Sequence, residues 1–286
     1  MKKINNLFFL FVISVLLTSC GKAPITGRSQ LLLVPESMVV DMGSQNYQSF
    51  MQQNPSIVPP TADVFMTKRV GQNISEAVER YMKATGNEEA IKGYRWEFNM
   101  TRSPEVNAWC MPGGKVMVYS GIMPLTKDET GLAVVIGHEI GHAVAQHTRE
   151  RMSQQLAIVA GTMALDVFMQ SKPKMTHDIF MTAAGVGSQL GMLAYSRQQE
   201  YEADKLGLIF MAMAGYNPER AISFWQDMVA LKSKGGKNAP PEYLSTHPSD
   251  ANRIAAIQSI MPEAMQYYKA STKNYPVKPN TTTKSR

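Results

Sequence analysis

The sequence predicts an α+β fold that is mostly α-helical. From about residue 128 onward, apolar residues recur at helical spacing through successive segments that are joined by short connections. Before that point, a few short stretches have the alternation and the flanking turn residues of strands. The chain has 286 residues, of which 44% are hydrophobic, so it can bury one sizeable core or two small ones.

The elements are expected in the following order along the chain. Strands are expected over residues 30–34, 94–99 and 115–119, the last of them entered through a Pro-Gly-Gly turn. Helices are expected over 36–53, 62–84, 128–150, 154–170, 177–194, 197–214, 217–232 and 250–260. Residues 156–169 are apolar but too few to cross a membrane and include Asp166, so we expect a buried helix there.

The N-terminal residues resemble a secretory signal peptide. Lys2 and Lys3 precede an uncharged apolar run over residues 7–17, which is too short for a stable transmembrane helix. Residues 17–20 read Leu-Thr-Ser-Cys and resemble a bacterial lipobox, in which the cysteine is lipidated and becomes the mature N-terminus. A lipidated Cys20 would anchor the chain without spanning the membrane, whereas an ordinary signal peptide is the alternative.

The formal net charge of +6 gives little indication of a nucleic-acid partner. Five of the positive charges lie in an acid-free stretch after residue 268, so the rest of the chain is close to neutral. We expect this stretch to be a solvated, disordered tail. If Cys20 is lipidated, Cys110 stands alone, so we expect neither an internal disulfide nor a thiolate metal site.

Residues 137–147 read GHEIGHAVAQH and contain three of the five histidines in the chain. On a helix of about 100° per residue, His138 and His142 lie about 40° apart, so both rings can reach one metal ion. Glu139 lies beside such a metal, where a base for a metal-bound water is needed. His147 lies about 140° from His142 on the same helix, so we expect it to face away as a surface or core-packing residue.

The third ligand is expected among the carboxylates of residues 196–207, SRQQEYEADKLG, which look like the start of a helix. Glu200 and Asp204 share one face of this helix, whereas Glu202 points about 200° away from Glu200. Two histidines from one helix and Glu200 from another make the His₂Glu set of catalytic zinc, with the fourth position open to water. Asp204 is then placed to accept the outer N–H of a ligand histidine.

Three glycines lie next to these side chains. Gly137 and Gly141 are four residues apart and form a stripe beside the histidines. We expect this stripe to leave room for a strand or a substrate to approach closely. Gly207 lies on the Glu200 side of its helix and permits close packing against another helix.

The motifs HEIGH at 138–142 and SRQQEYEAD at 196–204 resemble those of the zinc endopeptidases typified by HtpX, Ste24, OMA, LoiP and BepA. The resemblance covers residues 25–262 and includes PITGRSQLLLV, NAWCMPGGKVMVYSGIM and THPSDANRI. It implies a gluzincin-type metallopeptidase domain with a small β-sheet at the active-site cleft. The chain lacks the transmembrane helices of HtpX and Ste24, and after this domain it has a polar tail where BepA has helical repeats.

Position by position, the resemblance implies that His138, His142 and Glu200 bind one Zn²⁺ and that Glu139 is the general base. Asp204 matches the aspartate that ends the ExxxD motif.

Three further residues receive a role only through this resemblance. Asn107 and Ala108 fall where the family has an edge strand at the cleft, which could hold a peptide by strand addition. His247 matches a histidine that can cap the zinc or stabilise the oxyanion. Because His247 ends a Gly- and Pro-rich stretch typical of lids, we expect it to gate the zinc. A loop histidine that caps the next helix is the alternative.

The expected function is zinc-dependent endoproteolysis of misfolded or misassembled envelope proteins, through a zinc-activated water with Glu139 as general base. The alternative is an assembly factor or holdase whose zinc is normally capped by His247. We expect one Zn²⁺ per chain, unfolded or misassembled protein substrates, a lipid anchor on Cys20 and no nucleic-acid partner. Because Gly21 follows the cysteine, we expect a bacterial envelope location, at the outer membrane and facing the periplasm.

The expected organisation has four parts. A signal peptide ending in the lipobox covers residues 1–19, and a lipidated N-terminus with a linker covers 20–35. The zinc metallopeptidase domain covers 36–268, and the basic tail covers 269–286.

Overall fold

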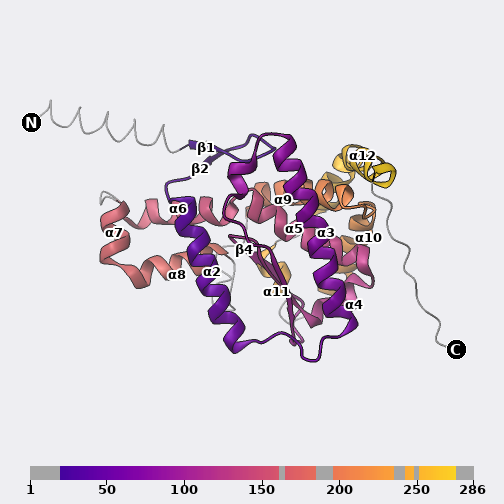
Figure 1. The fold of residues 1–286 in the computed structure, drawn as a ribbon, viewed down its shortest axis with the longest axis horizontal. Coiled ribbons are helices and arrows are strands. Elements are labelled where there is room, and N and C mark those ends of the chain that lie inside the picture. The colour runs from indigo at the N-terminus through magenta and orange to yellow at the C-terminus, as the bar shows by residue number, and fades with distance from the viewer. Residues whose placement is uncertain (1–19, 161–164, 185–195, 235–241, 248–250, 275–286) are drawn as a thin grey trace, which may run out of the picture.

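The structure is a computed structural model that describes residues 20–160, 165–184, 196–234, 242–247 and 251–274. Within these ranges the fold is α+β and mostly helical, as predicted, with helices packed around a small central sheet (Figure 1). The predicted signal peptide, residues 1–19, lies outside the described residues, as do residues 275–286 of the predicted tail.

The described strands form two small sheets. β1 (Cys20–Lys22) pairs antiparallel with β2 (Ser29–Leu31). The central sheet has the order β3-β5-β4, in which β5 (Lys115–Tyr119) is parallel to β3 (Glu97–Thr101) and antiparallel to β4 (Ala108–Met111). Ala108 therefore begins an edge strand, as the resemblance implied.

The helices before the motif region agree closely with the sequence. α2 (Glu36–Gln53) and α3 (Ala62–Ala84) have the predicted bounds. The other described helices, apart from two short 3₁₀ turns, are α4 (Met123–Thr126), α5 (Glu129–Val144), α6 (His147–Ala160), α7 (Leu165–Ser171), α8 (Pro173–Ala184), α9 (Arg197–Met213), α10 (Arg220–Lys234), α11 (Glu242–Thr246) and α12 (Ala251–Asn274).

The predicted helix over 128–150 is in fact two helices. Asp128 caps the start of α5, where its Oδ1 accepts a hydrogen bond of 2.7 Å from the Gly131 amide. α5 ends at Val144 because Gln146 has φ +58°, a left-handed conformation that cannot continue an α-helix. α6 then begins at His147, so residues after the break do not follow the helical angles of α5.

The segments after α5 also differ from the prediction. The expected buried helix over 156–169 is wrong in part, because the Ile158 side chain of α6 is 75% exposed, and residues 161–164 lie outside the described residues. In α7 the Val167 side chain is 56% exposed, whereas those of Phe168 and Met169 are buried. Figure 1 shows α7 and α8 extending from one side of the molecule. Among the described helices, none combines the length and the apolar character that crossing a membrane requires.

The last helix is longer than expected. α12 was predicted to end near residue 260, but it runs through Pro262 to Asn274. Residues 269–274, which were expected in a disordered tail, are therefore helical.

The central sheet separates two hydrophobic clusters. Ala108 and Cys110 of β4 face the larger cluster, which includes residues of α3, α5, α9, α10 and α12. Trp109 and Met111 alternate to the other face and join the smaller cluster with residues of α2, α6, α7 and α8. Because β4 is buried on both faces, it has no polar alternation, which is why the sequence did not indicate it as a strand.

Helices α5 and α9 touch backbone to backbone through glycines. A Cβ atom on Gly207 would lie 2.8 Å from the main-chain carbon of Gly137, and one on Gly141 would lie 2.7 Å from the carbonyl oxygen of Ala203. The close packing predicted for Gly207 is confirmed. The room beside Gly137 and Gly141 is filled by a helix, however, and not by the strand or substrate that we expected.

Residues 28–34, which were expected in a linker, are packed against α6. The Leu33 and Val34 amides donate to the Ser153 hydroxyl at 3.0 and 3.2 Å. In turn, Nε of Arg149 donates to the Val34 carbonyl at 2.6 Å. These contacts attach the N-terminal segment to the helix that follows the HEIGH motif.

The glycine contact yields a test of stability. Gly207→Ala should lower the free energy of unfolding by about 1–3 kcal/mol, because the added methyl meets main-chain atoms that cannot move aside. The control is Lys205→Ala on the same helix, a half-exposed ion pair whose loss should change stability by less than about 1 kcal/mol. Urea unfolding measures both variants, and a Gly207→Ala protein as stable as the control would contradict the contact.

Candidate metal centre

Three predicted ligands converge from two helices. His138 and His142 lie one turn apart on α5, and Glu200 lies in the first turn of α9. The Nε2 atoms of the two histidines are 3.0 Å apart. Oε1 of Glu200 is 3.3 Å from Nε2 of His142, and its Oε2 is 3.7 Å from Nε2 of His138. All three side chains are buried.

These distances fit a tetrahedral metal. Ligand bonds of 2.0–2.2 Å in a tetrahedron separate two donor atoms by about 3.3 Å. The 3.0 Å between the two histidine Nε2 atoms and the 3.3 Å from His142 to Oε1 of Glu200 are close to this spacing. Oε1 of Glu200 is buried and has no hydrogen-bond partner among the described residues, so it is available as a ligand atom. The donor set therefore fits a divalent metal such as zinc.

Arg253 of α12 holds the carboxylates of α9 in place. Its Nη1 donates to Oε2 of Glu200 at 2.5 Å, which leaves Oε1 facing His142. Its Nε and Nη2 donate to the two oxygens of Asp204 at 2.7 and 2.8 Å. The guanidinium is 1% exposed and lies 3.6 Å from the ring centroid of Trp225. Sequence reasoning gave Arg253 no role, although it lies in the quoted THPSDANRI segment.

Asp204 orients His138, in the position predicted for it. Its Oδ1 lies 2.9 Å from Nδ1 of His138, which leaves Nε2 for the metal. Burial acts to raise the pKa of Asp204, but the charge of Arg253 and the hydrogen bond from His138 outweigh it and lower the pKa to about 2. Asp204 is therefore an ionised acceptor at neutral pH.

His247 and Tyr243 approach the same group from α11 and the residue after it. His247 lies with His138, His142 and Glu200 in one buried set whose donor atoms are all within 4.8 Å of one another. Its Nε2 is 3.6 Å from Oε1 of Glu139. The Tyr243 ring stacks on it at a centroid distance of 4.5 Å.

Burial sets the protonation of these groups. It lowers the pKa of His138 to about 4 and that of His142 further below its usual value, so both rings are neutral, as metal ligands must be. Burial raises the pKa of Glu139 to about 8 against the opposing influence of the nearby Tyr243 hydroxyl and the charge of Arg253. Glu139 can therefore exchange a proton near neutral pH.

The prediction that His147 faces away is wrong. The break after Val144 turns the chain, so Nδ1 of His147 lies 2.8 Å from Nδ1 of His142. The other ring nitrogen of His147, Nε2, lies 2.9 Å from Oε2 of Glu202. Glu202 does point away from Glu200, as predicted, and its carboxylate contacts His147.

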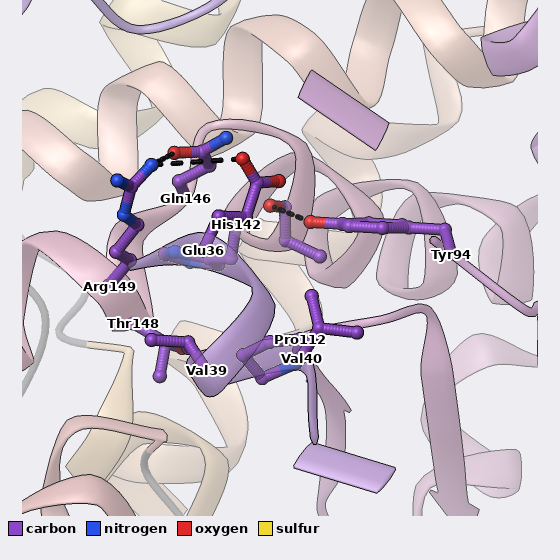
Figure 2. Close-up of a pocket in the computed structure, with 10 residues that line it drawn as sticks. Glu36, Val39, Val40, Tyr94, Pro112, His142, Gln146, Thr148 and Arg149 are labelled. Carbon is purple, nitrogen blue, oxygen red and sulfur yellow. Dashed lines mark hydrogen bonds and ion pairs between the residues drawn. The ribbon is translucent and has the colours of Figure 1, made fainter. Parts of the chain in front are cut away.

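Figure 2 shows a small pocket at this break. Gln146 and Arg149 point toward Glu36 at the start of α2, and His142 lines the pocket from α5. Nη1 of Arg149 donates to the Gln146 side chain at 2.9 Å. The Tyr94 hydroxyl donates to the Ala143 carbonyl at 2.8 Å, so a group at the end of α5 is held from outside the helix. The break is therefore supported from several elements.

Asn107 and Ala108 lie at the edge of the central sheet. The Ala108 amide donates to the Asn107 side-chain oxygen at 2.9 Å, and the Asn107 carbonyl accepts from the Tyr119 amide at 3.1 Å. Just before them, the Val106 carbonyl accepts a hydrogen bond of 3.1 Å from the Tyr243 amide. The start of the edge strand and α11 are thus directly joined.

Comparison with known proteins is consistent with this centre. The model of peptidase family M48 matches residues 69–261. Mitochondrial metalloendopeptidase OMA1 of Saccharomyces cerevisiae is 29% identical over 89% of this chain and 72% of its own length. OMA1 of Schizosaccharomyces pombe is 34% identical over 67% of this chain and 53% of its own length. The beta-barrel assembly-enhancing protease of Escherichia coli is 27% identical over 56% of this chain and 33% of its own length.

These relatives contradict one prediction. We expected a bacterial envelope location at the outer membrane, but the relatives that match about nine-tenths of the chain are mitochondrial proteins of eukaryotes, including yeast and human OMA1. The outer-membrane assignment is therefore withdrawn. It rested on the residues around Cys20 and on Gly21, which carry no information about the metallopeptidase fold.

The buried guanidinium yields a second test. Arg253→Met should lower the free energy of unfolding by about 3–5 kcal/mol, because it leaves Glu200 and Asp204 buried without their cation. The control is Arg69→Met, which breaks the exposed pair with Glu129 and should cost about 0–1 kcal/mol. Chemical denaturation measures both, and similar losses in the two variants would refute the role given to Arg253.

Proposed function

The chain belongs to peptidase family M48 and is a metalloendopeptidase, and we propose that it cleaves peptide bonds with one Zn²⁺ held by His138, His142 and Glu200. The observation that carries the proposal is a buried group in which Nε2 of His142 lies 3.0 Å from Nε2 of His138 and 3.3 Å from Oε1 of Glu200. A zinc ion bound there would polarise the scissile carbonyl and lower the pKa of its water toward about 7.

Glu139 is proposed as the general base. It follows the ligand His138 on α5 and is buried beside the metal group. A carboxylate in this position can accept a proton from the attacking water and return it to the leaving amine. His138 stays neutral in this scheme: its Nδ1 donates its hydrogen to Asp204, and its Nε2 is left for the metal.

Substrates are proposed to be unfolded or misassembled polypeptides. An extended peptide can add to the edge of the central sheet at Asn107 and Ala108, where backbone hydrogen bonds would hold it whatever its sequence. Only a segment that is unfolded, at least locally, has its own backbone groups available for such pairing. The chain spans about half or less of the length of most of the relatives described above. This substrate class is therefore a proposal and is not taken over from those longer proteins.

A second function is favoured by one observation. His247 is 2% exposed, and its Nε2 lies inside the group of potential ligand atoms. Such a histidine can occupy the fourth metal position and exclude water. The chain would then act as an assembly factor or holdase that rarely cleaves.

Two parts of the expected organisation remain separate proposals. Lipidation of Cys20 would attach the chain to a membrane, and mass spectrometry of the N-terminal peptide would detect the added acyl chains. The zinc domain was predicted to cover residues 36–268, and because α12 continues to Asn274, we propose that its C-terminal boundary lies beyond residue 268, which limited proteolysis would test.

The peptidase proposal predicts a large effect of Glu139→Gln. Cleavage of casein should fall by about 10²–10⁴-fold, because the base is lost while all three ligands remain. Bound zinc, measured by elemental analysis, should stay at one per chain. The control Glu76→Gln lies at an exposed position on α3 and should cleave like wild type. Equal cleavage by Glu139→Gln and wild type would favour the holdase, and a wild-type chain that binds no zinc would contradict both functions.

The capping histidine has its own test. If His247 normally occupies the fourth position, His247→Ala should cleave casein faster than wild type while its zinc affinity falls. If His247 stabilises the oxyanion, cleavage should fall by about 10²–10³-fold with zinc affinity unchanged. If the variant equals wild type in both cleavage rate and zinc affinity, His247 has neither of these roles at the metal centre.

A further inference from the structure

The two histidine ligands are supported in different ways. Nδ1 of His138 meets the carboxylate of Asp204 directly at 2.9 Å. Nδ1 of His142 instead meets a second histidine, His147, at 2.8 Å. His147 is fully buried and meets Glu202 through its other nitrogen. The support of His142 therefore extends one residue further than that of His138.

The hydrogen positions in this arrangement are determined by the metal site. Because His142 faces the other ligand atoms with Nε2, its Nδ1 carries the hydrogen and donates to Nδ1 of His147. His147 then carries its hydrogen on Nε2 and donates to Oε2 of Glu202 at 2.9 Å. Each ring nitrogen of His142 and His147 is then a hydrogen-bond donor, a hydrogen-bond acceptor or a metal ligand, and both rings are neutral.

Glu202 is fixed in turn by the N-terminal segment. Nε of Arg28 donates to Oε2 of Glu202 at 2.5 Å, and the Thr26 hydroxyl donates to Oε1. The other nitrogens of Arg28 bind both oxygens of Glu150 on α6 at 2.8 and 2.7 Å. The side chains of Glu150 and Glu202 are each 4% exposed, so these hydrogen bonds are largely protected from water.

We propose that Arg28, Glu202 and His147 form a positioning row that fixes the ring of His142, so that the N-terminal segment sets how tightly the chain holds its metal. This inference rests on the proposed zinc site. None of the three residues touches the metal or the substrate, and they act only through His142. Outer partners of this kind typically contribute 10–100-fold to metal affinity.

The alternative is that the row only holds the N-terminal segment on the fold. That segment, however, has a second attachment that does not include the row, through the Ser153 hydroxyl and the Leu33 and Val34 amides. The two attachments can therefore be removed separately, and only one of them leads to His142.

The first experiment measures zinc affinity by chelator competition on the full chain. His147→Phe should bind Zn²⁺ about 10–100-fold more weakly than wild type, because Nδ1 of His142 loses its acceptor. His147→Asn should recover part of this loss, since its amide oxygen can accept at the former Nδ1 position. The control Ser153→Ala removes the two hydrogen bonds of the Leu33 and Val34 amides, leaves the Arg149–Val34 bond in place, and should leave zinc affinity unchanged.

The second experiment uses Arg28→Met, at a partly exposed site, as a single variant that can be measured even if His147→Phe does not fold. Where His147→Phe folds, the two substitutions are also combined in a double-mutant cycle. Arg28→Met alone should weaken zinc binding by several-fold. In the His147→Phe background it should add nothing, because its effect passes through His147. The same variants loaded with Co²⁺ should show altered visible absorption bands, whereas Ser153→Ala should match wild type.

The outcomes separate the inference from the proposed function. If wild type binds no Zn²⁺, the proposed function fails. If wild type binds Zn²⁺ and both His147→Phe and Arg28→Met bind it equally well, only the positioning row is overturned. Equal weakening by Ser153→Ala, or fully additive effects of Arg28→Met and His147→Phe, would also overturn it, because docking of the segment would then be sufficient.

Discussion

The structure depends on the contact between helices α5 and α9. Glycines at 137, 141 and 207 let the two backbones approach within ordinary atomic contact, closer than any side chain would allow. This contact brings the carboxylate of Glu200 to the histidines of the HEIGH motif. The surrounding elements (α12, α11 and the N-terminal segment) all attach to this pair of helices. A fold with larger residues at these positions would keep His138, His142 and Glu200 and separate them in space.

The sequence predicted those parts of the site that depend on regular helix geometry. His138, His142 and Glu139 lie within one continuous helix, and Glu200 and Asp204 within another, so a fixed angle per residue relates them. The predicted orientation of His147 was wrong because Gln146 adopts a left-handed backbone conformation, which the sequence did not indicate. Glutamine is not a residue that usually marks such a break.

Other features could not be predicted because they depend on contacts between distant segments. Arg253 is paired with carboxylates 49 and 53 residues away, and no local pattern marks a buried arginine. The apolar stretch around Ile158 was expected in the core, but its neighbours leave that side chain exposed. Strand β4 was hidden by burial on both faces, which removes the alternation that reveals most strands. In each case the tertiary environment, and not local preference, decided the outcome.

The placement of Arg253 also has a consequence for biosynthesis. A chain leaving the ribosome exposes His138, His142 and Glu200 well before Arg253, which follows Glu200 by 53 residues. Until then, Glu200 and Asp204 have no cation to offset their burial, so the two helices cannot close into a finished site at low cost. Assembly of the centre is therefore ordered in time. A nascent or truncated polypeptide that ends before α12 lacks the guanidinium that holds Glu200 and Asp204 in the complete structure.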